Sequence, residues 1–288
     1  MRIDQLLVQR GLASTRSQAQ RLIADGVQWK KGDEWKAVAK NGDDVPEDAP
    51  IELLDDSEAR YVSRGGLKLE AALQHVGLSV TGLRCLDVGQ STGGFTDCLL
   101  QAGAQAVVGV DVGSAQLHPR LREDARVLCV EGVNARTLSA TDLIAAYTDS
   151  TGADGQFDLE DDGPDEEGDA AAALAGLPPE FAPPFDLLVA DLSFISQTLV
   201  LPAAVELLRE GGTLLTLVKP QFELQPGQVG KGGIVKDATM YPIVEQRLRE
   251  TCAALGLTVT AWFDSPIEGG DGNREFFICA RKTGVSSS

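Results

Sequence analysis

The chain has 288 residues, 43% of them hydrophobic, and a formal net charge of −18 at pH 7. This length suits one domain of ordinary size plus a small one, and the hydrophobic fraction suffices for packed cores. No hydrophobic run approaches the roughly 20 residues that span a bilayer, and the five cysteines lack the spacing of a disulfide framework or a zinc site. We therefore expect a cytoplasmic protein with no membrane partner and no metal site.

Residues 1–54 are predicted to form a small α/β unit. Two short helices come first, and the second, over 17–24, has Ser14 or Thr15 as its N-cap. Short strands are expected at 27–29 and, after a Lys31–Asp33 turn and a polar loop, at 51–54. Residues 1–40 carry eight basic residues against four acidic ones, so the negative charge of the whole chain hides a basic end. Such an end is a candidate phosphate-binding face.

A linker is expected over 55–63, and a larger domain over 64–288. After a helix over 66–75, hydrophobic strands alternate with helical patterns, which indicates a mostly parallel sheet with helices on both faces. The expected strands are 83–88, 106–110, 126–130, 185–190, 213–218, 257–263 and 275–281, and the expected helices are 94–102, 138–147, 197–209 and 237–254.

An acidic stretch interrupts this alternation between the third and fourth strands. Residues 149–184 contain eleven acidic residues and no lysine or arginine. The stretch is rich in Asp, Glu, Gly, Ala and Pro, and has too few large hydrophobic residues to build a core of its own. We predict that it is a disordered surface insertion.

The glycine-rich turn after the first strand of the larger domain suggests a nucleoside cofactor. Asp87 precedes Gly89, Gly93 and Gly94, and the next strand ends in Asp111, placed to bind ribose hydroxyls. The glycines do not have the G-x-G-x-x-G spacing of dinucleotide sites. An acid at this turn would repel a pyrophosphate but suits the cationic methionine part of S-adenosylmethionine. The alternative is an ordinary glycine-rich turn.

Charged residues also follow the fourth and fifth strands, as Asp191 and Lys219. Groups at the carboxyl ends of strands meet at one edge of an open α/β sheet. Lys68 and Glu275 are two further candidates for this polar cluster. A lysine near a second ammonium and partly removed from water has a lowered pKa, and can orient a sugar hydroxyl or take its proton.

These residues carry a resemblance that covers nearly the whole chain except the acidic stretch. Lys68, Asp191, Lys219 and Glu275 match in order the K-D-K-E tetrad of RNA ribose 2′-O-methyltransferases of the FtsJ type. The N-terminal unit resembles the small RNA-binding domain named for ribosomal protein S4, without the asparagine of its usual V-x-V-N-G turn. The combination is similar to the TlyA/haemolysin A family. It implies a Rossmann-like S-adenosylmethionine-dependent methyltransferase that modifies ribosomal RNA, with cytidine as the usual target.

The resemblance also implies roles for individual residues. Lys219 is the expected base or orienting amine, held by Asp191, with Lys68 and Glu275 completing the tetrad. The expected cofactor-binding residues are Asp87, Gly89, Ser91, Thr92, Gly93, Asp111 and, at the adenine, Asn134. The expected RNA-binding residues are Arg2, Arg16, Arg21, Lys30, Lys31 and Arg64. The run Gln221–Glu223 either shapes the RNA pocket or forms a structural turn.

The expected partners are ribosomal RNA or ribosomal subunits, and not DNA, because the 2′-hydroxyl that would be modified distinguishes RNA from DNA. Two other interpretations remain open at this point. One is an RNA-binding assembly factor without activity, which has no need of both lysines and both acids. The other is a pore-forming haemolysin, which the lack of a membrane-spanning run opposes.

Overall fold

A computed structural model describes residues 1–13, 15–54, 59–151, 177–267 and 272–283. The chain divides into two compact units, Met1–Leu67 and Lys68–Ser288. The boundary thus falls within the helix that begins at Gly65, whereas the sequence suggests a linker over 55–63. Residues 55–58 of that linker and 152–176 of the acidic stretch lie outside the described residues.

Among its described residues, the first unit contains two complete helices and a three-stranded antiparallel sheet in the order β2-β1-β3. Its elements are α1 (Ile3–Gln9), α2 (Arg16–Gly26), β1 (Val27–Lys31), β2 (Glu34–Ala37) and β3 (Ile51–Leu53). Thr15 caps α2 as expected, its hydroxyl accepting the backbone N–H of Gln18 at 3.2 Å. Ile3, Leu6 and Leu22 are fully buried in the unit's own core.

The second unit is built around a seven-stranded sheet in the order β6-β5-β4-β7-β8-β10-β9. The five strands from β6 to β8 are parallel, and β10 runs antiparallel to both β8 and β9. The strands are β4 (Arg84–Val88), β5 (Ala106–Asp111), β6 (Val127–Glu131), β7 (Phe185–Asp191), β8 (Leu208–Val218), β9 (Leu257–Asp264) and β10 (Phe276–Lys282). This mixed, largely parallel sheet confirms the predicted Rossmann-like α/β fold.

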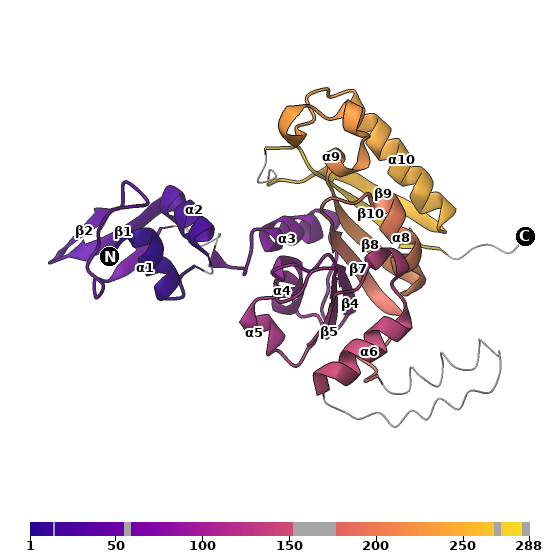
Figure 1. The fold of residues 1–288 in the computed structure, drawn as a ribbon, viewed down its shortest axis with the longest axis horizontal. Coiled ribbons are helices and arrows are strands. Elements are labelled where there is room, and N and C mark those ends of the chain that lie inside the picture. The colour runs from indigo at the N-terminus through magenta and orange to yellow at the C-terminus, as the bar shows by residue number, and fades with distance from the viewer. Residues whose placement is uncertain (14, 55–58, 152–176, 268–271, 284–288) are drawn as a thin grey trace, which may run out of the picture. The chain divides into compact units, whose positions relative to one another are not determined.

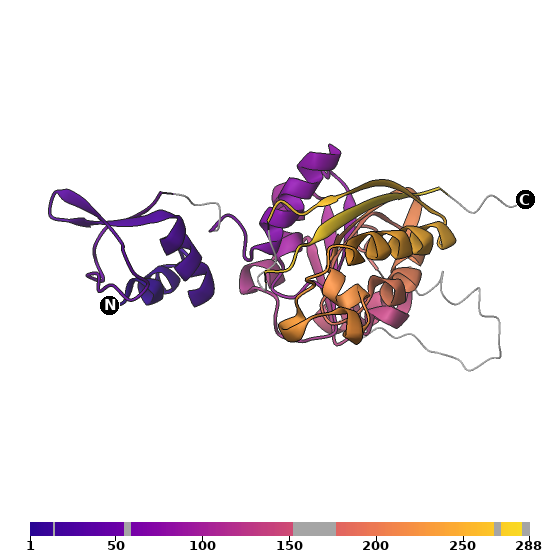
Figure 2. The same ribbon diagram turned by 90° about the horizontal axis from the view of Figure 1, so that it is seen from above.

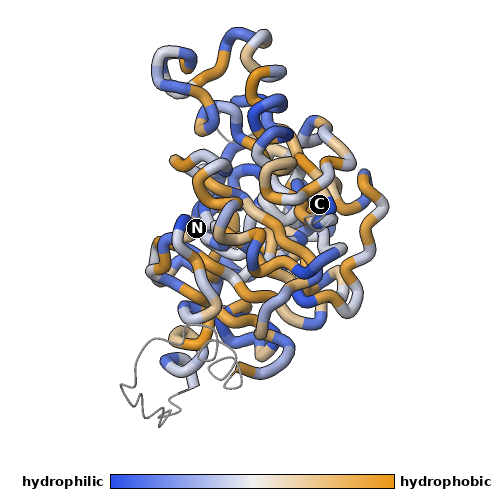
Figure 3. Tube along the Cα trace, turned by 90° about the vertical axis from the view of Figure 1, so that its right-hand side faces the viewer, coloured by the Kyte–Doolittle hydropathy of each residue, from blue (hydrophilic) through white to orange (hydrophobic). Residues whose placement is uncertain are grey.

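Helices cover both faces of this sheet (Figures 1 and 2). They are α3 (Gly65–Val76), α4 (Gly94–Gln101), α5 (Pro119–Arg122), α6 (Ala140–Thr151), α8 (Gln197–Glu206), α9 (Pro220–Glu223) and α10 (Met240–Ala254), with short 3₁₀ turns at Ala135–Thr137, Pro226–Gln228 and Lys231–Gly233. In the tube coloured by hydropathy, short hydrophobic and hydrophilic stretches alternate along the chain (Figure 3).

Alternation along β4 decides which residues serve the core and which serve the site. Leu86 and Val88 belong to the hydrophobic cluster that also contains residues of α6, α8 and α10. Successive side chains of a strand point to opposite faces, so Asp87 faces the other side, where Thr96 of α4 contacts it. One strand therefore supplies both core packing and a polar group beneath the glycine-rich turn.

The expected elements agree with the structure except around residue 208. The helical pattern predicted a helix to residue 209, but α8 ends at Glu206 and β8 begins at Leu208. The reason is pairing: Leu208 lies opposite Phe185 in the parallel β7–β8 ladder, before the register shifts to Leu187 and Thr213. The four-residue helices α5 and α9 are too short for a periodic pattern and were not predicted, and neither was the strand β2, whose four residues are all exposed.

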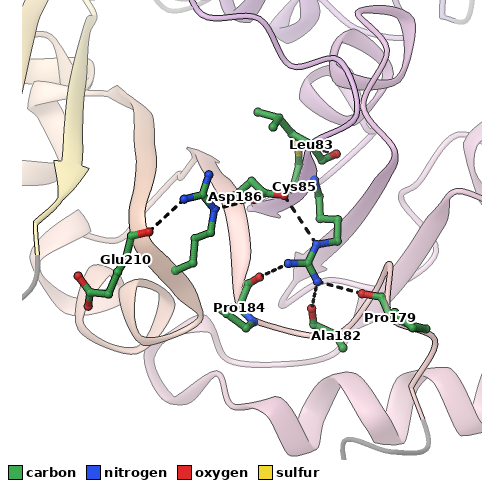
Figure 4. Close-up of polar contacts among 9 residues, drawn as sticks. Leu83, Cys85, Pro179, Ala182, Pro184, Asp186 and Glu210 are labelled. Atoms are coloured by element: carbon green, nitrogen blue, oxygen red, sulfur yellow. Dashed lines mark hydrogen bonds and ion pairs between the residues drawn. The ribbon is translucent and has the colours of Figure 1, made fainter.

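At both ends of the predicted disordered insertion, residues 149–184, the structure instead shows residues that belong to the fold. Residues up to Thr151 belong to α6, and Leu177 and Phe181 are buried in the core. The guanidinium of Arg84 fastens this returning segment by donating to the carbonyls of Pro179, Ala182 and Pro184 at 3.0, 3.1 and 2.7 Å (Figure 4). Residues 179–184 are thus bound to β4, of which Arg84 is the first residue.

Candidate active site

The glycine-rich turn after β4 holds its backbone against the end of β7. Gly89 has φ 84°, and a Cβ atom there would lie 2.6 Å from the carbonyl oxygen of Asp191. Gly93 has φ 98° and precedes α4, and a Cβ there would meet the side chains of Leu117 and Leu121 at 2.7 and 2.4 Å. Both positions therefore require glycine, for the backbone angle and for the space.

Asp111, at the end of β5, organises the same turn. Its Oδ2 accepts the backbone N–H of Ser91 at 2.7 Å, and its Oδ1 accepts that of Gly113 at 2.7 Å. The bond to Ser91 holds a non-glycine residue at φ 49°, in the left-handed region. Such strain is maintained only where the surroundings over-determine the backbone. Each carboxylate oxygen still has a lone pair for a hydroxyl.

Asp87 lies fully buried beneath the turn. Its Oδ2 accepts the hydroxyl of Thr96 at 2.7 Å, and that hydroxyl in turn accepts the side-chain amide of Gln90 at 2.9 Å. Its buried Oδ1 has no hydrogen-bond partner among the described residues. Burial raises the pKa of Asp87 to about 7, the Thr96 bond opposes this, and the negative charge of Asp191 adds to it. The site thus contains a carboxyl group that titrates near neutral pH.

A pocket of about 660 Å³ opens beside these residues. Five of the predicted cofactor-binding and catalytic residues line it, namely Gly89, Ser91, Asp111, Asn134 and Asp191. Asp87 and Gly93 are buried and are not among the lining residues, and Thr92 accepts the backbone N–H of His118 through its carbonyl. Residues that sequence reasoning missed also line the pocket, among them Val112, Gln116, Arg136 and Phe194.

Phe194 illustrates why pocket-lining residues were missed in the sequence. Phe194 is 90% exposed, at φ 65°, with its ring centroid 5.1 Å from that of Phe222. An exposed aromatic ring at a strained backbone position is invisible in a sequence pattern, although the run Asp191–Phe194 after the strand marks the segment. Arg136 follows Asn134, whose side-chain oxygen accepts the Arg136 backbone N–H at 3.1 Å.

The four residues of the predicted tetrad form two ion pairs. Lys68 Nζ lies 2.5 Å from Glu275 Oε2, and Lys219 Nζ lies 2.5 Å from Asp191 Oδ1. Lys219 also donates to the hydroxyl of Ser193 at 3.0 Å, a partner that was not predicted. Lys68 and Glu275 are almost fully buried, whereas the side chains of Lys219 and Asp191 are 13% and 26% exposed.

The electrostatics of Glu275 link the two pairs. Burial raises the pKa of Glu275, the positive charges of Lys68 and Lys219 lower it, and the negative charge of Asp191 raises it again. The structure therefore brings all four groups together, although Lys68 and Glu275 are 207 residues apart in sequence. Asp191 belongs to both the tetrad and the pocket lining, so a group bound in the pocket adjoins the lysines.

The predicted RNA-binding residues of the first unit differ in exposure and in their contacts. Arg16 was expected to project to solvent, and both Arg2 and Arg16 are exposed, while each also binds the buried carboxylate of Asp4, at 3.0 and 2.8 Å. Their guanidinium groups, led by the hydrogen bond from Arg2, hold the pKa of Asp4 well below its usual range. Lys31 is exposed, and Arg21, Lys30 and Arg64 are half-buried.

A Rossmann-like sheet ending in an antiparallel hairpin, with an acidic glycine-rich turn beside a lysine–carboxylate cluster, defines the class of nucleoside-cofactor methyltransferases. Comparisons with known proteins make this specific. The chain belongs to the FtsJ-like methyltransferase family, whose model matches residues 61–282, and the S4 domain model matches residues 1–26. The predicted family resemblance is confirmed.

Two curated relatives and one solved structure show how far the similarity extends. A 16S/23S rRNA (cytidine-2′-O)-methyltransferase, TlyA of Mycobacterium tuberculosis, is 37% identical over 97% of this chain and 89% of its own length. Hemolysin A of Brachyspira hyodysenteriae is 33% identical over 96% and 98%. A solved structure from Streptococcus thermophilus, titled as a hemolysin candidate, has a TM-score of 0.66 and 35% identity, covering 98% of this chain and 88% of the other.

Proposed function

We propose that this protein transfers a methyl group from S-adenosylmethionine to the 2′-hydroxyl of a cytidine in ribosomal RNA. The observation that carries this proposal is the tetrad of Lys68, Asp191, Lys219 and Glu275 at the edge of the pocket. An RNA-binding factor without activity gains nothing from two buried or half-buried ion pairs at this position, because burying charges costs free energy.

The residues around the pocket fit S-adenosylmethionine. Gly89 presents bare backbone to the pocket, and Asp87 offers a buried oxygen with no partner among the described residues, suited to a cationic group nearby. We assign the methionine end to the turn from Asp87 to Gly93, the ribose to Asp111 and the adenine to the neighbourhood of Asn134. When bound, this cofactor supplies a methyl group activated by a sulfonium.

The tetrad would then act on the acceptor hydroxyl. Lys219 Nζ is ion-paired with Asp191 and donates to the hydroxyl of Ser193, which leaves a further donor or lone-pair direction for the 2′-oxygen. Lys219 would orient that oxygen or accept its proton, Asp191 would hold the amine, and the Lys68–Glu275 pair would fix the electrostatic surroundings. Methyl transfer needs chiefly such alignment. Among the described residues, no cluster suited to holding a metal ion is found.

The first unit would supply affinity for the RNA backbone. We assign phosphate contacts to the basic residues Arg2, Arg16, Arg21, Lys30, Lys31 and Arg64, which give little sequence preference by themselves. The partner would be ribosomal RNA or a ribosomal subunit in the cytoplasm. Within the part of the chain that the structure describes, no helix is both long and apolar enough to cross a membrane.

The test is transfer of a labelled methyl group to ribosomal RNA and ribosomal subunits from cells lacking this protein. Mapping of 2′-O-methyl positions should reveal a cytidine that the wild-type protein modifies. Lys219→Ala should abolish transfer while calorimetry still shows cofactor binding. Unchanged transfer by that variant would refute the assigned chemistry, and leakage of liposomes exposed to the pure protein would favour the haemolysin interpretation instead.

A further inference from the structure

Glu223, the last residue of α9, is a buried carboxylate that receives donors from another helix. It is 4% exposed. Its Oε2 accepts the hydroxyl of Ser196 at 2.5 Å, and its Oε1 accepts the backbone N–H of Gln197 at 2.8 Å. These donors lie at the N-terminus of α8, where N–H groups have no partner within the helix and negative charge is favoured.

The bonds continue from Glu223 into the sheet. Gln197 is itself buried, its amide donates to the carbonyl of Leu217 at 2.7 Å, and its oxygen accepts the hydroxyl of Thr216 at 2.7 Å. From the other side, Arg247 of α10 donates to the backbone carbonyl of Glu223. Both carboxylate oxygens of Glu223 and both polar atoms of the Gln197 side chain are therefore engaged. Buried networks satisfied in this way specify one arrangement of their members.

This network joins the two segments that carry the exposed half of the tetrad. The loop 191–196 runs from β7 to α8 and begins with Asp191, while Lys219 directly precedes α9. The contacts of Lys219 with Asp191 and Ser193 connect the same two segments at the pocket. The distances from the amine to Asp191 and to Ser193 therefore depend on how α9 is fastened to the start of α8.

We propose that Glu223 is a positioning residue for methyl transfer, which clamps the loop 191–196 to α9 and so holds Asp191 and Ser193 against Lys219. This inference rests on the proposed function. Glu223 acts through its two hydrogen bonds and does not touch the reacting atoms. Burial raises the pKa of Glu223, and the donors Gln197 and Ser196 and the charge of Arg247 oppose that rise.

Two substitutions separate the hydrogen bonds from the charge. Glu223→Gln keeps both bonds, because the amide oxygen can accept from Gln197 while the amide nitrogen donates to the Ser196 hydroxyl. Glu223→Ala removes both and leaves the donors of α8 unsatisfied. Glu206→Ala, an exposed acid on the same helix α8, is the matched control.

In single- and multiple-turnover transfer to ribosomal RNA, Glu223→Ala should lower kcat roughly 10- to 100-fold, as expected for displaced reacting groups. The KM and the calorimetric Kd for the cofactor should not change, and Glu223→Gln and Glu206→Ala should stay within a few-fold of wild type. A wild-type kcat in Glu223→Ala would overturn the proposal. So would equal losses in the Gln and Ala variants, or a loss confined to KM.

Hydrogen exchange keeps the two proposals distinguishable. Amides of residues 191–198 should lose protection in Glu223→Ala and keep it in Glu223→Gln. Unchanged protection overturns the clamp even if the wild-type protein transfers no methyl group, a result that would refute the proposed function separately. If Glu223→Ala does not fold, Ser196→Ala removes one of the two bonds and should lower kcat several-fold, and an unchanged kcat there overturns the clamp.

Discussion

Asp87→Asn should make the cofactor-free protein more stable at neutral pH while weakening its binding of S-adenosylmethionine. Asparagine mimics the protonated carboxyl group, and its side-chain oxygen can still accept the hydroxyl of Thr96. The buried carboxylate has a cost that the amide lacks, because burial raises the pKa of Asp87 from 3.8 to about 7. The same charge would favour the cationic methionine end of the cofactor, so its removal should lower affinity.

The size and sign of the stability effect follow from linkage. Between pH 3.8 and about 7 the folded protein holds a proton on Asp87 that the unfolded chain releases. This stabilisation is complete below the lower value and is lost as the pH rises through the upper one. At about 1.4 kcal/mol per pH unit, the wild type should lose roughly 4 kcal/mol relative to the variant across this window.

Urea unfolding of both proteins from about pH 4.5 to about pH 8 measures this difference over most of the window. Trp262 of the second unit can serve as the fluorescence probe once Trp29 and Trp35 of the first unit are replaced by phenylalanine. The gap in unfolding free energy should widen steadily with pH and level off above about 7. A gap that stays constant with pH would refute the assignment of a titrating, buried Asp87.

Three further substitutions test other parts of the structure. Gly89→Ala should weaken cofactor binding in calorimetry and cost about 1–3 kcal/mol of stability, because the residue has φ 84° and faces a carbonyl oxygen at 2.6 Å. Arg84→Ala should lower the free energy of urea unfolding by about 1.5–3 kcal/mol, because it removes hydrogen bonds to three carbonyls. The control Arg126→Ala loses an exposed ion pair with Asp124 and should lower it by less than about 1 kcal/mol. Equal losses in the two variants would contradict this prediction. Asp4→Asn should weaken RNA binding in a filter assay even though it removes a negative charge, because Arg16 loses the carboxylate that orients it. Tighter binding would show that net charge dominates.

The sheet and its functional edge were predictable because strands β4, β5, β7 and β8 are rich in hydrophobic residues and alternate with helical patterns. Each ends at or near a charged residue, and parallel strands bring these ends together. That rule places Asp111, Asp191 and Lys219 at one edge without any knowledge of distances. Lys68 and Glu275 were also candidates for this cluster, but only the family resemblance gave them roles, since nothing in their local pattern indicates that they pair.

What the sequence could not reveal depends on partners far along the chain or on backbone geometry. Glu223 is four residues from Lys219, but the hydrogen bonds that define its role come from residues 26 and 27 positions away. Phe194 is notable because of a positive φ and its exposure, which no composition rule predicts. The ion pairs of Arg2 and Arg16 with Asp4 likewise require the fold of the first unit before they can be seen.

The position of β10 late in the chain has a consequence for when the tetrad forms during synthesis. This strand enters the sheet between β8 and β9, and Glu275 arrives immediately before it. During synthesis the first unit, with its own core, emerges and can fold early. Lys68 can pair with the carboxylate of Glu275 only after nearly all of the described chain has been made. Under the proposed function, a nascent chain that has not yet reached Glu275 lacks one member of the tetrad and should not transfer a methyl group.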